Sequence, residues 1–224
     1  MGIDCSLFNI HLLSYNETME HIILDTNFFF NLEIKSGFGD SSKEVIANFT
    51  QLARQTKTAK KADFFMPPAI LDEFLTFVSV QDTYVKEFLT VVTVKSPHIA
   101  TINFEASIFY KLVDEIRDRS YKGLRIAEES VDAAGAKVMG QAALTKIEYQ
   151  KTIGEVVSKL RERYRQATRF NFLDSIADLD LIVLAKELDG ILVTSDEGVL
   201  RWGRLFGIKE LPAAQLKPRL MAMG

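Results

Sequence analysis

The sequence has few of the side chains that bind soft metals or form disulfides. Its single cysteine, Cys5, excludes an internal disulfide and disfavours a cysteine-based zinc site. Its three histidines, His11, His21 and His98, are scattered along the chain, which argues against a histidine cluster. Any bound metal would therefore have to be held by carboxylate oxygens, which are the ligands that Mg²⁺ and Mn²⁺ prefer.

Long apolar runs are also missing. No stretch approaches the roughly 20 apolar residues that are needed to span a bilayer. The N-terminal stretch MGIDCSLFNIHLLSYNETME lacks the basic start and the unbroken apolar core of a signal peptide. We therefore expect a soluble cytoplasmic protein without a membrane partner, in which residues 1–18 form a loosely specified extension.

The chain has no overall excess of basic charge, but its charges are unevenly distributed. The net charge is −3. Residues 103–170 hold 13 Lys and Arg against 10 Asp and Glu, whereas the rest of the chain holds 14 against 20. A basic middle and an acidic remainder would suit a protein that binds a polyanion in one region and a metal in the other.

Short apolar runs alternate with amphipathic segments in both halves of the chain. The runs read as buried strands; they lie at 21–24, 62–66, the second half of 84–97, 191–195 and 208–211. The amphipathic segments read as helices; they lie at 40–57, 69–78, the first half of 84–97, 174–190 and 196–207. This alternation predicts a parallel α/β sheet with helices on its faces.

The region from 103 to 170 shows no strand pattern. Apolar residues recur at helical spacing in 103–120 and again in 152–169. Gly135 and Gly140 are expected to break the helical pattern between them. The simplest interpretation is a helical hairpin that projects from the α/β body as an arm.

Basic residues repeat on the predicted arm. Arg161, Arg165 and Arg169 stand four residues apart and share one helical face, and Lys122 and Arg125 lie on the other half of the hairpin. Such a face is either ordinary solvated surface or a site that binds phosphates, and the sequence alone leaves both open.

Carboxylates occur at three places in the predicted body. Asp25 follows the first strand, Asp196 follows the strand at 191–195, and Asp174 and Asp178 are spaced to share a helical face. Each Asp alone could be a turn or helix-capping residue, and Glu73 is a further candidate. Together at one sheet edge they would repel one another unless a cation lay among them.

An all-carboxylate cluster suits hydrolysis of a phosphodiester with the help of a divalent metal. Asn27 and Ser195 are natural phosphate-contacting groups beside it. The rival chemistry, a nucleophilic aspartate of the phosphatase type, needs a second Asp two residues after Asp25, and that position is Asn27. The sequence therefore favours metal-assisted hydrolysis.

Three segments resemble those of a PIN-domain nuclease: ILDTNFFF, LDSIADLDLIVLAKELDG and LVTSDEGVLRWGRLFGIKEL. More specifically, they are similar to the small protein-only ribonuclease P family, the homologues of the Aquifex enzyme. YKGLRIAEES and LRERYRQA resemble that family's helical insertion. The resemblance runs from about residue 20 to 212 and departs at the N-terminal extension and around AGAKVMGQAALTKIEYQ, which leaves the length and turn of the arm open.

The resemblance implies an enzyme that removes the 5′ leader of precursor tRNA with Mg²⁺ and without an RNA subunit. It also implies a large homo-oligomer built from dimers. By position, Asp25, Asp174, Asp178 and Asp196 match the family's catalytic, metal-holding acids, and Glu73 matches in less distinctive surroundings. The expected RNA-binding residues of the insertion are Lys122, Arg125, Arg161 and Arg165.

On this interpretation, the chain divides into a PIN-like nuclease domain over 19–102 and 171–215 and an insertion over 103–170 for RNA binding and oligomerisation. Two alternatives remain. One is a toxin-like PIN ribonuclease that cuts tRNA or mRNA internally, although a minimal toxin would not need the insertion. The other is an RNA-binding accessory protein without catalysis, although all four acids are present.

Overall fold

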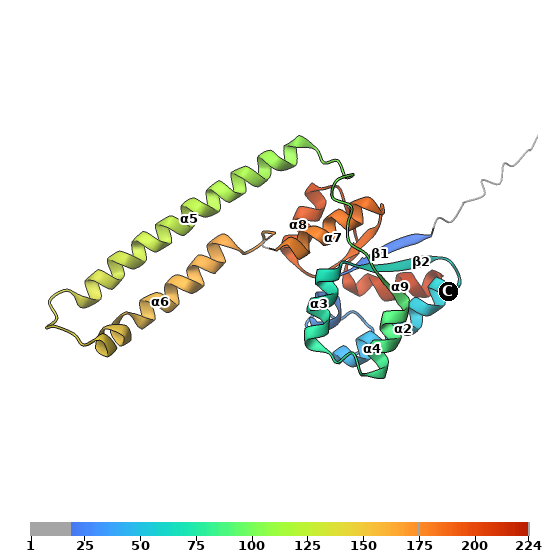
Figure 1. Ribbon diagram of the computed structural model, residues 1–224, viewed down its shortest axis with the longest axis horizontal. Helices are drawn as coiled ribbons and strands as arrows, with labels where there is room; N and C mark the ends of the chain where they lie inside the picture. Colours follow the sequence, from blue (N-terminus) through green and yellow to red (C-terminus); the bar gives the residue numbers. More distant parts are fainter. Residues whose placement is uncertain (1–18, 174, 224) are drawn as a thin grey trace, which may run out of the picture.

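The computed structural model, which describes residues 19–173 and 175–223, shows an α/β body from which a long helical hairpin projects (Figure 1). A five-stranded sheet in the order β3-β2-β1-β4-β5 forms the centre of the body, and all of its neighbouring strands are parallel. This arrangement confirms the predicted fold class, a parallel sheet flanked by helices with an inserted helical arm.

The five strands are short, and the last three residues of the central strand are buried. They are β1 (Glu20–Leu24), β2 (Ala62–Met66), β3 (Val92–Val94), β4 (Ile191–Val193) and β5 (Lys209–Glu210). Ile23 of β1 lies opposite Phe65 on one side and Leu192 on the other, and its side chain is fully buried. The apolar run predicted this position, because a strand covered on both faces carries no polar alternation.

The direction in which the sheet grows reverses at β1. The chain adds β2 and β3 on one side of β1, and later adds β4 and β5 on the other. The carboxyl ends of β1 and β4 therefore border the switch point, which is where open α/β sheets bind their ligands. Asp25 follows β1 directly and Thr194 follows β4 directly.

The helices of the body enclose an aromatic core. They are α1 (Asn27–Phe30), α2 (Ser42–Thr58), α3 (Pro68–Phe77), α4 (Thr83–Val91), α7 (Ile176–Glu187), α8 (Glu197–Leu205) and α9 (Ala213–Met223). Phe29 of the short helix α1 makes edge-on contacts with Phe49, Phe74 and Phe88, at centroid distances of 5.5, 5.4 and 5.1 Å. The three phenylalanines that follow Asp25-Thr26-Asn27 thus anchor the loop that holds Asp25.

One helix start and one whole helix in the body differ from the sequence prediction. Helix α7 begins at Ile176, and the Ser175 hydroxyl caps it by accepting a hydrogen bond from the Asp178 N–H at 3.0 Å. The predicted helix began at Asp174, which lies outside the described residues. Helix α9 was not predicted, since it contains Pro218, and residue 215 falls inside it. The division into an insertion and a two-part nuclease domain stays a prediction.

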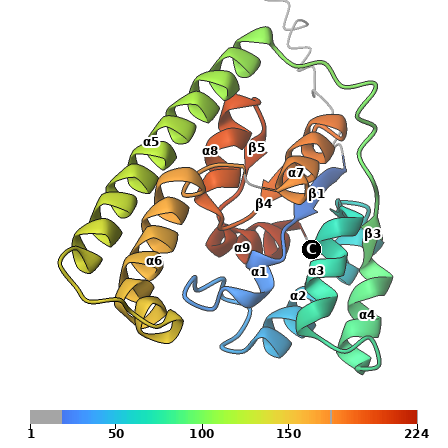
Figure 2. The same ribbon diagram turned by 60° about the vertical axis from the view of Figure 1, so that its left-hand side comes forward.

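The arm consists of α5 (Ala106–Val138) and α6 (Lys146–Thr168), which lie side by side (Figures 1 and 2). The prediction that Gly135 breaks the helix is wrong, because α5 continues through it at the modest cost of about 1 kcal/mol that an interior glycine carries. The turn instead contains Gly140, whose φ of 77° favours glycine. A capping box of Thr145 and Glu148 then starts α6.

Both arm helices are long, but charged residues interrupt them throughout. Across the described ranges, no helix combines the length and the apolarity required to cross a membrane.

Candidate active site

Asp25 is the most buried acid at the carboxyl edge of the sheet, with 4% of its surface exposed. Its Oδ2 accepts a short hydrogen bond from the Thr194 hydroxyl and another from Asn27 Nδ2 at 3.3 Å. Thr194 Oγ1 in turn accepts a hydrogen bond from the Asp196 N–H at 3.0 Å. A buried threonine thus connects the end of β1 to the loop after β4 and fixes both acids at one edge.

The pKa of Asp25 is shifted by its burial and by other acids near it. Burial raises this pKa most, the negative charges of Glu73 and Asp178 also raise it, and the hydrogen bonds from Thr194 and the Asn27 backbone lower it; the net result is a pKa of about 6. Glu73 of α3 and Asp178 of α7 therefore lie close enough to act on Asp25 electrostatically. An acid buried among negative charges is held in its ionised form at neutral pH most readily by a cation.

Asp196 has a second, structural function. Its Oδ1 accepts a hydrogen bond from the Val199 N–H at 3.0 Å, so it caps the N-terminus of α8. The alternative reading of Asp196 as a helix cap is therefore correct, and a capping carboxylate keeps lone pairs for other partners. Helix α7 is capped by Ser175, and the same alternative for Asp174 lies outside the described residues.

The acids offer hard oxygen donors, which fit Mg²⁺ or Mn²⁺. Among the described residues, however, no three Asp, Glu, His or Cys side chains come together as a finished metal site. The set of Asp25, Asp174, Asp178 and Asp196, with Glu73, stays a prediction, and one of its members, Asp174, lies outside the described residues. The fit rests on donor chemistry and on the raised pKa of Asp25.

A cleft of about 1130 Å³ separates the acidic edge from the arm. The body contributes Asn27, Asn31, Ser195 and Asp196 to its lining, and the arm contributes Arg165 of α6 and Arg169 directly after α6. Figure 2 shows α6 between α5 and the part of the body around α1. The cleft is larger than most small-molecule pockets. Its arm side holds Arg165 and Arg169 together with Glu162, so this side has a net positive charge. This arrangement suits a nucleic-acid strand whose phosphate backbone lies in the cleft beside the acids.

The predicted RNA-binding residues do not all face this cleft. Arg165 lines it, whereas Lys122 of α5 lines a separate hollow of about 460 Å³. Arg125 is exposed and lies 3.9 Å from Glu129, and Arg161 is exposed on α6. The basic residues are therefore spread over the base and sides of the arm.

Thr194 was missed by the sequence prediction. It is 2% exposed, and it bridges Asp25 and the Asp196 backbone. The available signal was its position as the first polar residue after a buried strand, directly before Ser195 and Asp196. Asn31 was also missed; its Nδ2 donates to Ser195 Oγ at 3.4 Å, which extends the polar rim of the cleft.

Comparison with known proteins agrees with this geometry. The family described as PINc domain ribonuclease matches residues 21–223, which cover the sheet, the acidic edge and the arm. The fold and the site thus define a PIN-type ribonuclease.

Similar proteins extend over nearly the whole chain. A protein of Thermodesulfovibrio yellowstonii is 32% identical over 211 residues, covering 94% of this chain and 98% of the relative. One of Thermococcus onnurineus is 35% identical, covering 87% and 90%, and one of Alkalilimnicola ehrlichii is 34% identical, covering 92% and 98%. All three are named RNA-free ribonuclease P. The chain belongs to this family of PIN-domain ribonucleases, which confirms the resemblance noted in its sequence.

Proposed function

We propose that this protein is a divalent-metal-dependent endoribonuclease that removes the 5′ leader of precursor tRNA without an RNA subunit. The observation that carries the proposal is the match to proteins named RNA-free ribonuclease P, which covers 94% of this chain and 98% of one relative. The alignment extends over the arm as well as the nuclease sheet. That extent favours leader removal over the toxin-like alternative, in which the arm has no assigned role.

Each acid has a proposed role at the sheet edge. Asp25, Asp174, Asp178 and Asp196, with Glu73 as a further ligand, would hold Mg²⁺ or Mn²⁺. When bound, such an ion polarises the scissile phosphate and lowers the pKa of a water molecule. Thr194 holds Asp25 in place through its short hydrogen bond.

The cleft orients the RNA strand on this proposal. Asn27, Asn31 and Ser195 are placed to donate hydrogen bonds to phosphate oxygens near the acids. Arg165 and Arg169, on the opposite wall, neutralise phosphate charge without reading sequence. The proposed contacts therefore position the backbone rather than select bases.

The arm would carry the body of the tRNA. Lys122 and Arg125 on α5 and Arg161 and Arg165 on α6 are the proposed RNA-binding residues, and all four are exposed. A protein acting on precursor tRNA shares its compartment, so we place this one in the cytoplasm.

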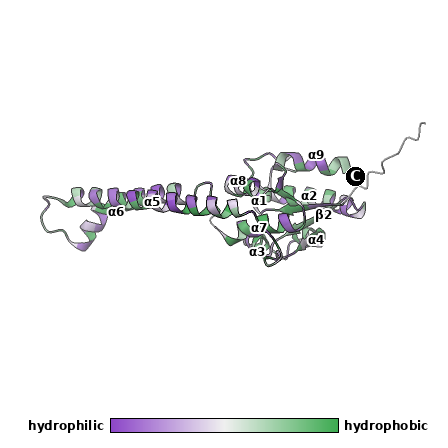
Figure 3. Cartoon of the chain, turned by 90° about the horizontal axis from the view of Figure 1, so that it is seen from above, coloured by the Kyte–Doolittle hydropathy of each residue, from purple (hydrophilic) through white to green (hydrophobic). Residues whose placement is uncertain are grey.

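We also propose that the protein is a homo-oligomer built from dimers. Apolar residues recur along α5 (Figure 3), and several of their side chains are exposed. Phe109, Tyr110 and Val113 are 55%, 76% and 63% exposed, and Ile116 and Leu124 continue the row. A second copy of the arm is the natural cover for such a row.

The direct test is cleavage of a precursor tRNA that carries a 5′ leader, with Mg²⁺, followed by sequencing of the product ends. We expect one cut at the junction of leader and mature tRNA, and no cut in excess EDTA. Internal cuts would favour the toxin-like alternative, and binding without cleavage would favour the accessory protein.

A further inference from the structure

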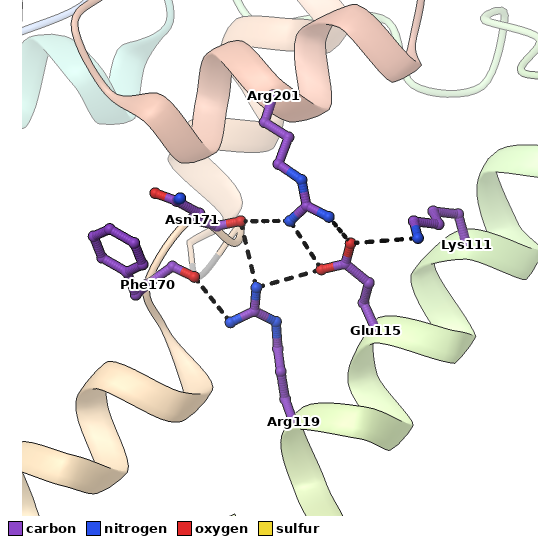
Figure 4. Close-up of polar contacts among 6 residues, drawn as sticks. All are labelled: Lys111, Glu115, Arg119, Phe170, Asn171 and Arg201. Carbon is purple, nitrogen blue, oxygen red and sulfur yellow. Dashed lines mark hydrogen bonds and ion pairs between the residues drawn. The ribbon is translucent and has the colours of Figure 1, made fainter. Parts of the chain in front are cut away.

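A cluster of charged side chains joins the arm to the body (Figure 4). Glu115 of α5 is only 9% exposed, and its carboxylate accepts hydrogen bonds from both terminal nitrogens of Arg201 on α8. One of these contacts measures 3.1 Å, from Arg201 Nη1 to Oε2. Arg119, one turn further along α5, donates to the same carboxylate at 3.3 Å, and Lys111 Nζ lies 3.9 Å away. We refer to Glu115, Arg119 and Arg201 as the arm anchor.

The arm anchor also holds the connection between α6 and α7. Arg201 Nη1 donates to the Asn171 carbonyl at 3.0 Å, and Arg119 Nη1 donates to the Phe170 carbonyl at 3.0 Å. The Arg119 guanidinium lies over the Phe172 ring, 4.6 Å from its centroid. One cluster thus connects three elements: the first half of α5, the return from the arm, and α8.

The connection that the anchor holds follows a tight path against α8. Asn171 has a φ of 55°, a left-handed conformation that asparagine tolerates better than most residues. A methyl group added at Gly198 would come within 2.9 Å of the Phe172 carbonyl oxygen, so the first turn of α8 presses on this backbone. That turn is the one capped by Asp196. The arm is therefore fixed directly to the helix that carries a proposed catalytic acid.

Stability alone does not account for an ionic junction of this kind. Burial by itself would raise the pKa of Glu115, but the hydrogen bonds and charges of Arg201 and Arg119 outweigh burial, and this pKa is lowered. Even so, replacing a buried ion pair with apolar side chains is often neutral or stabilising. What a forked arginine–carboxylate contact adds is a fixed geometry.

We propose that the arm anchor sets the angle of the arm on the body and thereby the nucleotide at which precursor tRNA is cut. This inference rests on the proposed leader-removing activity. If the arm holds the tRNA body while the acids lie at the sheet edge, the span between the two contacts selects the phosphate that reaches the acids. Glu115, Arg119 and Arg201 are positioning residues in this scheme, because they act through the orientation of other groups.

The experiment maps 5′ ends after single-turnover cleavage of full precursor tRNA in Mg²⁺. Glu115→Gln keeps the shape of the side chain but removes the charge that draws the two arginines together. We expect the fraction of cuts away from the main position to rise at least about fivefold, since small displacements of a bound substrate have large effects on rate. A short leader-junction RNA that cannot reach the arm should be cut at the wild-type rate.

Two further variants make the result specific. Arg201→Lys keeps the charge but loses the fork, and it should scatter the cuts as well. Glu155→Gln is the matched control: Glu155 is exposed on α6 and pairs with Lys137 and Lys159 at 2.7 and 3.0 Å, away from the body. It should leave the cut position unchanged.

Wild-type accuracy in both Glu115→Gln and Arg201→Lys would overturn the inference. Equal loss of rate on both RNAs, with a lowered melting temperature or failure to fold in both variants, would also overturn it, because the cluster would then be a stabilising element. A wild-type protein that makes no leader cut would instead refute the proposed function, and this inference with it.

Discussion

Helix α7 of the body buries five of its 12 residues, whereas α5 buries four of 33 and α6 one of 23. Two of the four in α5 are Glu115 and Ser130, which are polar. The body is organised around its own apolar core, but the arm has little core to organise it. Its shape depends on ion pairs, on the anchor at its base and on what binds along it. Substitutions in the body and substitutions in the arm should therefore have different consequences.

The largest effect is expected at the acidic edge. Asp178→Asn should reduce cleavage of both full precursor tRNA and a short junction RNA by at least about 10³-fold, because several kcal/mol of charge stabilisation are lost. The metal-free fold should be intact or slightly more stable, since one negative charge near Asp25 is removed. Single-turnover rates and thermal melting in EDTA check this. Wild-type cleavage rates would remove Asp178 from the site.

The aromatic core should be the next most sensitive region. Phe29→Ala removes a fully buried ring that contacts four others, and it should lower the free energy of unfolding by about 3–5 kcal/mol. Tyr110→Ser on the arm is the control; Tyr110 is 76% exposed, and its loss should change the stability of one subunit by less than about 0.5 kcal/mol. Urea unfolding at low protein concentration measures both, and equal losses would contradict the comparison.

The stability of the body should also depend on pH, because of Asp25. In metal-free protein the pKa of Asp25 is raised from 3.8 to about 6. The folded state then keeps a proton that the unfolded chain has lost, so the free energy of unfolding falls as pH rises between these two values and stays lower above them. We expect a loss of at most about 3 kcal/mol. Denaturation in EDTA at pH 4 and pH 7.5 tests it, and Asp25→Asn should abolish the difference.

Substitutions on the arm should affect substrate binding and leave the chemistry unchanged. Replacing Lys122 and Arg125 with Ala should weaken binding of precursor tRNA, and each lost phosphate contact should flatten the salt dependence by about one unit of slope. The short junction RNA should be cut at the wild-type rate. Equal losses on the two RNAs would indicate damage to folding or assembly, and no loss on either would favour the toxin-like alternative.

The smallest effect on the single subunit is expected from the apolar row on α5. Val113→Ser, at a side chain that is 63% exposed, should leave the fold of the subunit unchanged while it reduces the mass of the assembly in solution. Light scattering at micromolar concentration measures this, with Tyr149→Ser on α6 as a control outside the row. A wild-type protein that is strictly monomeric would refute the proposed homo-oligomer.

Local patterns were sufficient to predict most of the fold. The apolar run 21–24 predicted β1, and the change to helical spacing after 103 predicted the arm. Short or interrupted elements were not predictable: α1 has four residues, and α9 contains Pro218. The cap of α7, Ser175, was not singled out from the sequence, because several residues at this point are good capping residues.

The site was predicted less completely than the fold. The strand ends identified Asp25 and Asp196, and their common edge follows from parallel pairing. The cleft was not predictable, because its basic wall comes from α6 and its acidic wall from β1 and β4. The contact of Glu115 with Arg201, which joins the arm to the body, was not predictable either, because the two residues are 86 positions apart and no local pattern connects them.

The pairing of β1 with β4 has a consequence for the protein while it is being synthesised. Asp25 leaves the ribosome early, but the threonine that holds it lies 169 residues later in the chain. The arm helices, whose contacts are local, are complete before β4 exists, whereas the long-range pairing of the sheet comes last. A nascent or truncated chain that ends before β4 therefore lacks an assembled site. The hydrogen bond that holds Asp25 can therefore form only after β4 and Thr194 have been made.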